Sequence, residues 1–268
     1  MEYTASNIIT IRIPDGGIAR LECHDTLPTT AYLAREYAKA GYPDRYAVFS
    51  EKLETGAENV KQKNKNGERR GVYLSCILRP SIYPSKAGLI AHMATVAFIK
   101  ALEEHTTEEL GIGWISDLFC KDKNIGGVRL EAKLNSDFGF EYIIVNFSVD
   151  LSEDIFPPRI TDMIREVFVS ENTSISMIIA KNVLGKFYPL LDELKNPSKF
   201  MDTYNTKFIQ RNGKIRYTAN GKHRVGRILN VDTTDGSLIV EENKTIFHLS
   251  SVAGVSIKHK FRKKRATE

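Results

Sequence analysis

The feature that most constrains the fold is a long apolar stretch at residues 86–104, KAGLIAHMATVAFIKALEE. It is apolar around nearly the whole circumference of a helix until Glu103 and Glu104. Such a helix is stable in water only when other elements cover most of its surface. We therefore expect a central, buried helix in which His92 is a core histidine. No run approaches the roughly 18 uninterrupted apolar residues of a membrane span, so no membrane role is expected.

The pattern around this helix predicts a mixed sheet with helices, an α+β fold. Residues 7–23 alternate apolar and polar positions around Pro14-Asp-Gly-Gly17, which indicates a hairpin. Thr29 and Thr30 precede a helical stretch that ends at Gly41. We expect strands at 46–49, 72–78, 110–120, 125–134 and 140–149, a long loop at 51–68, and helices at 160–168, from 173 or 174 with a break at Pro189, and at 199–207.

The residue pattern changes near residue 208. Short β-type runs are separated by Asn212-Gly213, Asn220-Gly221, Asp235-Gly236 and Asn243-Lys244, a spacing typical of a small all-β barrel. We expect a main domain at 1–207, a barrel at 208–257 and a basic tail at 258–268.

Charge and cysteine content limit the function classes. The net charge of the chain is +5, and residues 258–268 alone carry six Lys or Arg and one Glu, so the rest of the chain is neutral. This distribution does not favour nucleic acid as a general partner. Cys23, Cys76 and Cys120 match neither a disulfide framework nor a zinc pattern, so we expect a reducing compartment, the cytoplasm.

Four segments, in this order, resemble the motifs of the biotin protein ligases, and the resemblance covers about residues 20–257. His24-Asp-Thr-Leu-Pro-Thr-Thr-Ala-Tyr-Leu33 resembles the family's Asp-Thr-x-x-Ser-Thr-Asn segment, and Val72-Tyr-Leu-Ser-Cys-Ile-Leu78 resembles its Leu-Tyr-Leu-Ser strand. Trp114-Ile-Ser-Asp-Leu118 resembles Lys-Trp-Pro-Asn-Asp-Leu without the lysine, and Lys123-Asn-Ile-Gly-Gly-Val-Arg-Leu-Glu131 resembles the Lys-x-x-Gly-Ile-Leu-x-Glu strand.

The resemblance implies a class II synthetase-like mixed sheet followed by an SH3-like barrel. It implies an enzyme that activates biotin with ATP and Mg²⁺ and transfers it to a lysine of a biotin carboxyl-carrier domain. The implied roles are biotin binding by Thr29, Thr30, Trp114 and Gly127, nucleotide binding by Arg69, Arg70 and Ser116, and catalysis by Asp117 and Arg70. No metal ligand is assigned, because the phosphates would bring the Mg²⁺.

The sequence departs from the family pattern within this site. The family has a lysine at the position of Gly113 and a Gly-Arg-Gly-Arg-x-Gly loop where Lys63-Asn-Lys-Asn-Gly-Glu-Arg-Arg-Gly71 stands. It has Gly-x-Gly-x-Asn in place of Asn146-Phe-Ser-Val-Asp150, and Asn in place of Ala31. We expect Phe147 and Ser148 to reshape the site, and the missing lysine to lower the rate by roughly 10²–10³-fold.

Three functions remain open. The first is a biotin–protein ligase, with weak or altered activity. The second is a non-catalytic homologue that binds biotin, a related acyl acid or a carrier domain. A lipoate ligase ranks below both, because Arg69-Arg-Gly-Val-Tyr73 lacks that family's glycine run. DNA binding is not expected, since no helix-turn-helix domain precedes the Asp-Thr segment, and the oligomeric state stays open, with a homodimer among the alternatives.

Overall fold

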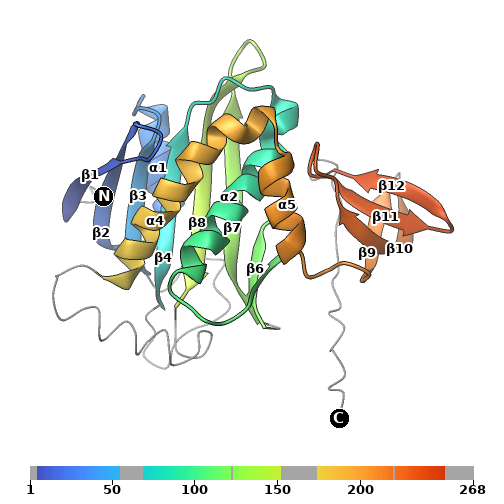
Figure 1. Cartoon of the computed structure of the whole chain (residues 1–268). Coiled ribbons are helices and arrows are strands. Elements are labelled where there is room, and N and C mark those ends of the chain that lie inside the picture. The colour runs from blue at the N-terminus through green and yellow to red at the C-terminus, as the bar shows by residue number, and fades with distance from the viewer. Residues whose placement is uncertain (1–4, 55–68, 122, 152–173, 220, 251–268) are drawn as a thin grey trace.

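The larger part of the chain is an eight-stranded mixed sheet with the strand order β1-β2-β3-β4-β8-β7-β6-β5 (Figure 1). The computed structural model describes residues 5–54, 69–121, 123–151, 174–219 and 221–250. β2 and β3 are parallel, and the other neighbouring pairs are antiparallel. The strands are β1 (Asn7–Arg12), β2 (Ile18–Leu27), β3 (Tyr46–Leu53), β4 (Arg69–Leu78), β5 (Leu110–Gly113), β6 (Asp117–Cys120), β7 (Lys123–Leu134) and β8 (Phe140–Asp150).

The two faces of this sheet are covered differently. One face carries α2, α4 and α5, and among the helices that the structure describes only α1 lies on the other (Figure 1). Residues 89–99 of α2 are all buried, so the prediction of a central helix with a core histidine is confirmed. The helices are α1 (Thr30–Lys39), α2 (Ala87–Glu103), α4 (Ile175–Leu190) and α5 (Ser198–Lys207), with short 3₁₀ turns at η1 (Pro84–Lys86) and η2 (Leu191–Lys195). By length and composition alone, residues Pro84–Glu103 could cross a membrane, but 72% of their most apolar window is buried, as in a core helix.

The smaller sheet is antiparallel and has the order β12-β11-β10-β9. Its strands are β9 (Lys214–Ala219), β10 (Lys222–Val231), β11 (Leu238–Glu242) and β12 (Thr245–Leu249). This arrangement agrees with a small C-terminal β unit. Its closure into an SH3-like barrel and a boundary at residue 207 stay predictions, and the basic tail lies outside the described residues.

The expected elements are largely confirmed, with one correction. The hairpin at 7–23, the helix after Thr29, and the helices ending near 190 and 207 are present. Residues 110–120, expected as one strand, are two antiparallel strands joined by a turn at 114–116. The single strand is wrong because Gly113 pairs with Asp117, which folds the segment back on itself. The expected helix at 160–168 lies outside the described residues.

Buried polar contacts attach the smaller sheet to the larger one. The Asn205 side chain on α5 donates to the Val231 carbonyl at 2.9 Å and accepts from the Val231 amide at 3.3 Å. His92 packs on the ring of Tyr204 and lies against Gly236, where an added Cβ would be 2.7 Å from Cε1 of the imidazole. His92 therefore lies at the junction of α2, α5 and the smaller sheet.

Gly126 and Gly127 lie where β7 passes unusually close to both of its neighbours. Their φ angles are 149° and 158°. A Cβ on Gly126 would be 2.0 Å from the Ser148 carbonyl oxygen, and one on Gly127 would be 2.3 Å from that of Ser116. The obstacles are backbone atoms, which cannot rotate aside, so this crossing requires glycine.

The state of His92 predicts an acid-sensitive contribution to stability. Its Nδ1 lies 2.7 Å from the Gly88 carbonyl, and its Nε2 has no partner among the described residues. Burial lowers the pKa of His92 to about 4. Because the unfolded chain binds the proton at a higher pH, stability should fall by about 3 kcal/mol as the pH drops from about 6.5 to 4. The free energy of unfolding, measured with urea at several pH values in this range, should depend less steeply on pH in His92→Asn than in the parent. The variant of an exposed histidine, His223→Asn, should keep the parent's pH dependence. The same pH dependence in all three proteins would contradict the prediction.

The close approach of β7 to its neighbours predicts that a methyl group at Gly127 lowers the free energy of unfolding. Gly127→Ala should lower the free energy of unfolding by about 1–3 kcal/mol, because the backbone of β6 or β7 must shift. Gly185→Ala on α4 is the matched control, since its Cβ would meet nothing within 4 Å, and it should be neutral or stabilising. Equal unfolding free energies for the two variants, measured by urea denaturation, would show that β7 tolerates a side chain there.

Candidate active site

The candidate site lies on the sheet face that carries α1, beyond the N-terminus of that helix. α1 packs over Val48, Ile77 and Ile144. Thr29 caps the helix, because its Oγ1 accepts from the Ala31 amide at 3.3 Å. Thr30 is buried and points onto the sheet, where its Oγ1 lies 2.7 Å from the Ser75 hydroxyl. The two predicted threonines thus have different tasks, Thr29 at the helix end and Thr30 toward the site.

Strand register places the site residues in two adjacent rows on this face. Paired residues on neighbouring strands point to the same side of a sheet. One row crosses β4, β8, β7, β6 and β5, and the other crosses β4, β8 and β7 two residues further along. The first row is Tyr73–Ser148–Gly127–Asp117–Gly113, and the second is Ser75–Asn146–Arg129.

A continuous polar network runs along the second row and back to α1. The Ser75 hydroxyl donates to Asn146 Oδ1 at 2.8 Å, and Asn146 Nδ2 donates to Glu131 Oε1 at 3.4 Å. The Glu131 carboxylate is also held by Arg35 of α1, whose Nε donates to Oε2 at 2.8 Å. Since Ser75 uses its hydrogen on Asn146, Thr30 donates to Ser75 and keeps a lone pair for a ligand N–H.

Asp117 and Ser116 are organised by an arginine that the sequence analysis did not select. Arg129 Nη2 donates to Asp117 Oδ1 at 2.6 Å, and Nη1 donates to the Val128 carbonyl at 2.8 Å. The Ser116 hydroxyl donates to the same carbonyl at 2.7 Å and is buried. Asp117 is therefore not an isolated acid, and Ser116 turns its hydroxyl into the sheet.

Trp114 is placed apart from Thr30, with which the sequence analysis grouped it. Its side chain is 5% exposed and belongs to the core under α2. The indole Nε1 donates to the Gly236 carbonyl of the smaller sheet at 3.3 Å, and the backbone amide donates to Gln210 Oε1 at 2.9 Å. The indole therefore joins the two sheets and turns away from the polar face.

Phe147 also differs from expectation. Even-numbered residues of β8 face the site and odd-numbered residues face α2, because strand side chains alternate. Phe147 accordingly packs edge-on against Phe98 and Phe187 in the core. The expectation that it reshapes the site is wrong; Asn146 and the exposed Ser148 stand there instead.

Gly113 has no space for a long side chain as the site stands. A Cβ at this position would be 2.7 Å from Cε2 of Phe119 and 3.3 Å from Nε2 of Gln210. The ring of Phe119 thus occupies the region into which a lysine at 113 would extend. A lysine at position 113 would therefore require the Phe119 ring on the neighbouring strand to move.

The predicted phosphate contacts are only partly placed. Arg69 and Arg70 begin β4 and pair with Leu53 and Lys52 across the strand, at the site end of the sheet. Their side chains and the loop at 55–68 lie outside what the structure describes. Nucleotide binding by these two arginines stays a prediction.

Three charged side chains of the site were given no role from the sequence, namely Arg35, Arg129 and Glu131. For Arg129 and Glu131 the available signal was a charged residue at every second position of β7. Arg35 carried no such signal, because it belongs to the site only through the packing of α1.

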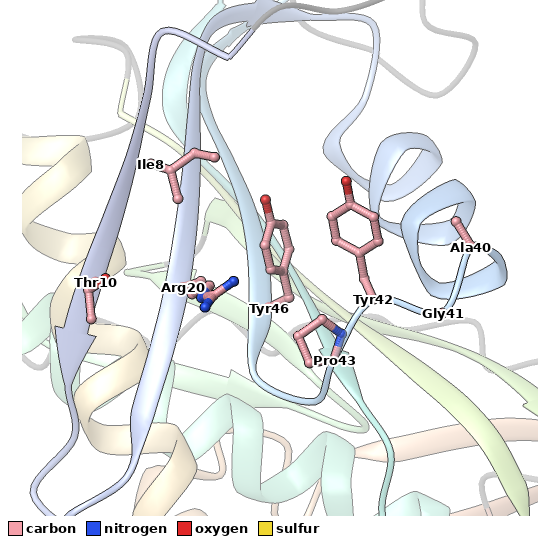
Figure 2. A pocket seen from close by; sticks show the side chains of 8 residues that line it. All are labelled: Ile8, Thr10, Arg20, Ala40, Gly41, Tyr42, Pro43 and Tyr46. Atoms are coloured by element: carbon pink, nitrogen blue, oxygen red, sulfur yellow. The ribbon is translucent and has the colours of Figure 1, made fainter.

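A hollow lies at the other end of α1 from the candidate site (Figure 2). Its volume is about 640 Å³, and it is lined by Ile8, Thr10, Arg20, Ala40, Gly41, Tyr42, Pro43 and Tyr46. Behind it, the buried Glu22 carboxylate accepts from the hydroxyls of Tyr37 and Tyr46 and contacts His24 Nε2. None of the predicted site residues lines this hollow.

The chain is similar in sequence to two curated ligases. It is 25% identical over 229 residues to the bifunctional ligase/repressor BirA of Bacillus subtilis (strain 168), covering 83% of this chain and 70% of that protein. It is 26% identical over 140 residues to the protein of the same name from Bacillus spizizenii, covering 52% of this chain and 43% of that one. No protein-family model matches the chain.

Solved structures share the fold. The biotin protein ligase of Aquifex aeolicus in complex with biotin and ATP superposes with a TM-score of 0.65 at 15% identity, over 90% of this chain and 99% of that one. A biotin protein ligase-like protein of unknown function from Silicibacter superposes with a TM-score of 0.61 at 16% identity, over 90% and 96%. Together with the sequence similarity and the ordered motifs around Thr30, Asp117 and Gly127, these matches show that the chain has the fold of the biotin protein ligases and is similar in sequence to the BirA ligases.

Proposed function

We propose that the chain is a biotin–protein ligase-like enzyme, which activates biotin with ATP to biotinyl-adenylate and transfers it to a lysine of a carrier protein in the cytoplasm. The observation that carries this proposal is the row of Thr30, Ser75 and Asn146 beside Asp117 and Gly127, on the one sheet face that α2 leaves open. The similarity to BirA supports the same reaction class.

The described residues fit a ligand with a polar head group. The urea of biotin offers both N–H donors and a carbonyl acceptor, and Thr30 has a lone pair directed away from its bond to Ser75. Arg69 and Arg70 would bind the ATP phosphates, which would bring Mg²⁺ with them. Asp117, bonded to Arg129, would line the part of the site that contacts the adenylate.

A second candidate function is supported by the space inside the site. Asn146 and Ser148 stand where the family has glycine, and the Phe119 ring lies beside Gly113. These side chains reduce the room for an adenylate and leave position 113 without a cation. They favour a non-catalytic homologue that binds biotin, a related acyl acid or a carrier domain.

Biotin-dependent ATP–pyrophosphate exchange separates the two candidates. The chain is mixed with Mg²⁺–ATP and labelled pyrophosphate, with and without biotin, and biotin binding is measured in parallel by calorimetry. We expect exchange above the biotin-free background, at a rate roughly 10²–10³-fold below a ligase that has the lysine. Background exchange together with biotin binding would replace the ligase proposal by the binding protein.

Variants of Thr30 and Thr29 should distinguish a residue that binds the ligand from one that caps the helix. Thr30→Val should weaken biotin binding about tenfold or more, because a buried hydroxyl contact is lost and Ser75 loses its donor. Thr29→Ala is the matched control: it should lower the free energy of unfolding by about 1 kcal/mol without changing biotin affinity. Calorimetry and urea unfolding of both variants test this, and unchanged affinity in Thr30→Val would remove Thr30 from the site.

A further inference from the structure

Position 113 is a glycine and has no cation, and of the two rows of site residues described above, the second contains a cation, Arg129. Gly113 pairs with Asp117, and Asp117 pairs with Gly127, two residues before Arg129 on β7. Arg129 reaches back across the strand and bonds Asp117 Oδ1 at 2.6 Å. Its guanidinium therefore ends beside the residue that directly faces Gly113.

The guanidinium is held in place but still accessible. The Val128 carbonyl at 2.8 Å and the Ser116 hydroxyl at 3.4 Å fix Nη1, and Asp117 fixes Nη2. The side chain is 67% exposed, and its remaining N–H groups have no acceptor within the part of the chain that the structure describes. Asp117 binds one N–H group and so orients the arginine while leaving other donors for a ligand.

We propose that Arg129 binds the carboxylate and phosphate of the acyl-adenylate, in place of the lysine that the family has at position 113. This inference rests on the proposed function. When the biotin carboxylate oxygen bonds to the α-phosphorus and the bond to pyrophosphate breaks, negative charge gathers on the phosphate oxygens. A guanidinium fork fixed beside Asp117 donates two N–H groups to such oxygens, which a point charge does not. Asp117 is then a positioning residue for Arg129.

The contribution of Arg129 is measured with Arg129→Gln and Arg129→Lys, and with Arg227→Gln as the matched control. Arg227 is an exposed arginine on the smaller sheet, paired with Glu241 across β10 and β11. The probe is the sulfamoyl analogue of biotinyl-adenylate, which is stable to hydrolysis, and its binding is measured by calorimetry beside exchange kinetics. We expect Arg129→Gln to bind the analogue at least tenfold more weakly and to exchange about 10²-fold more slowly, Arg129→Lys to recover part of both, and Arg227→Gln to match the parent.

The outcomes distinguish this assignment from the ligase proposal. Equal analogue affinity and exchange in the parent and Arg129→Gln overturn the assignment and leave the ligase proposal standing. A parent that does not exchange, but whose analogue binding depends on Arg129, overturns the ligase proposal and supports the assignment. A parent that neither exchanges nor binds the analogue overturns both. A lowered melting temperature with equal losses in the Gln and Lys variants shows a structural role and overturns the assignment.

Discussion

Burial of α2 against one face of the large sheet is the constraint on which the remaining structure depends. Because α2 is apolar on nearly every side, it takes up the odd-numbered side chains of β8 on one side and those of α4 and α5 on the others. Of the helices within the described residues, only α1 packs on the opposite face. Beyond the N-terminus of α1 that face carries a hydrogen-bonded polar network, since strand alternation directs every second side chain away from the core.

The junction between the two sheets depends on the same helix. Trp114 and His92 contact Gly236, and Asn205 binds Val231. The turn after β5, α2 and α5 thereby attach the smaller sheet to the larger one. A tryptophan in a segment that resembles a ligand-binding motif thus has a structural task. Its neighbour Asp117, three residues later, faces the site, because the chain reverses direction between them.

Three departures from the biotin protein ligase pattern, at Gly113, Asn146 and Ser148, lie on the same face of the large sheet. Asn146 enters the site where glycine is usual and is satisfied by Ser75 and Glu131. Phe119 lies beside Gly113, and Arg129 lies two strands away from Gly113, on the far side of β6. A buried polar side chain is costly unless it is hydrogen-bonded, so Asn146 requires these partners. Asn146 is therefore part of a hydrogen-bonded polar network within the site.

The sequence by itself determined the central helix, the terminal hairpin, the order of strands and helices apart from the reversal within 110–120, and the threonines at the start of α1, because these depend on local periodicity and capping. It did not determine which of Trp114, Phe147, Asn146 and Arg129 face the site. That is decided by strand register and by the turn at 114–116, since a shift of one residue moves every side chain to the other face. The pairing of Arg35 with Glu131 likewise exists only because α1 packs across β7, a contact between residues far apart in the chain.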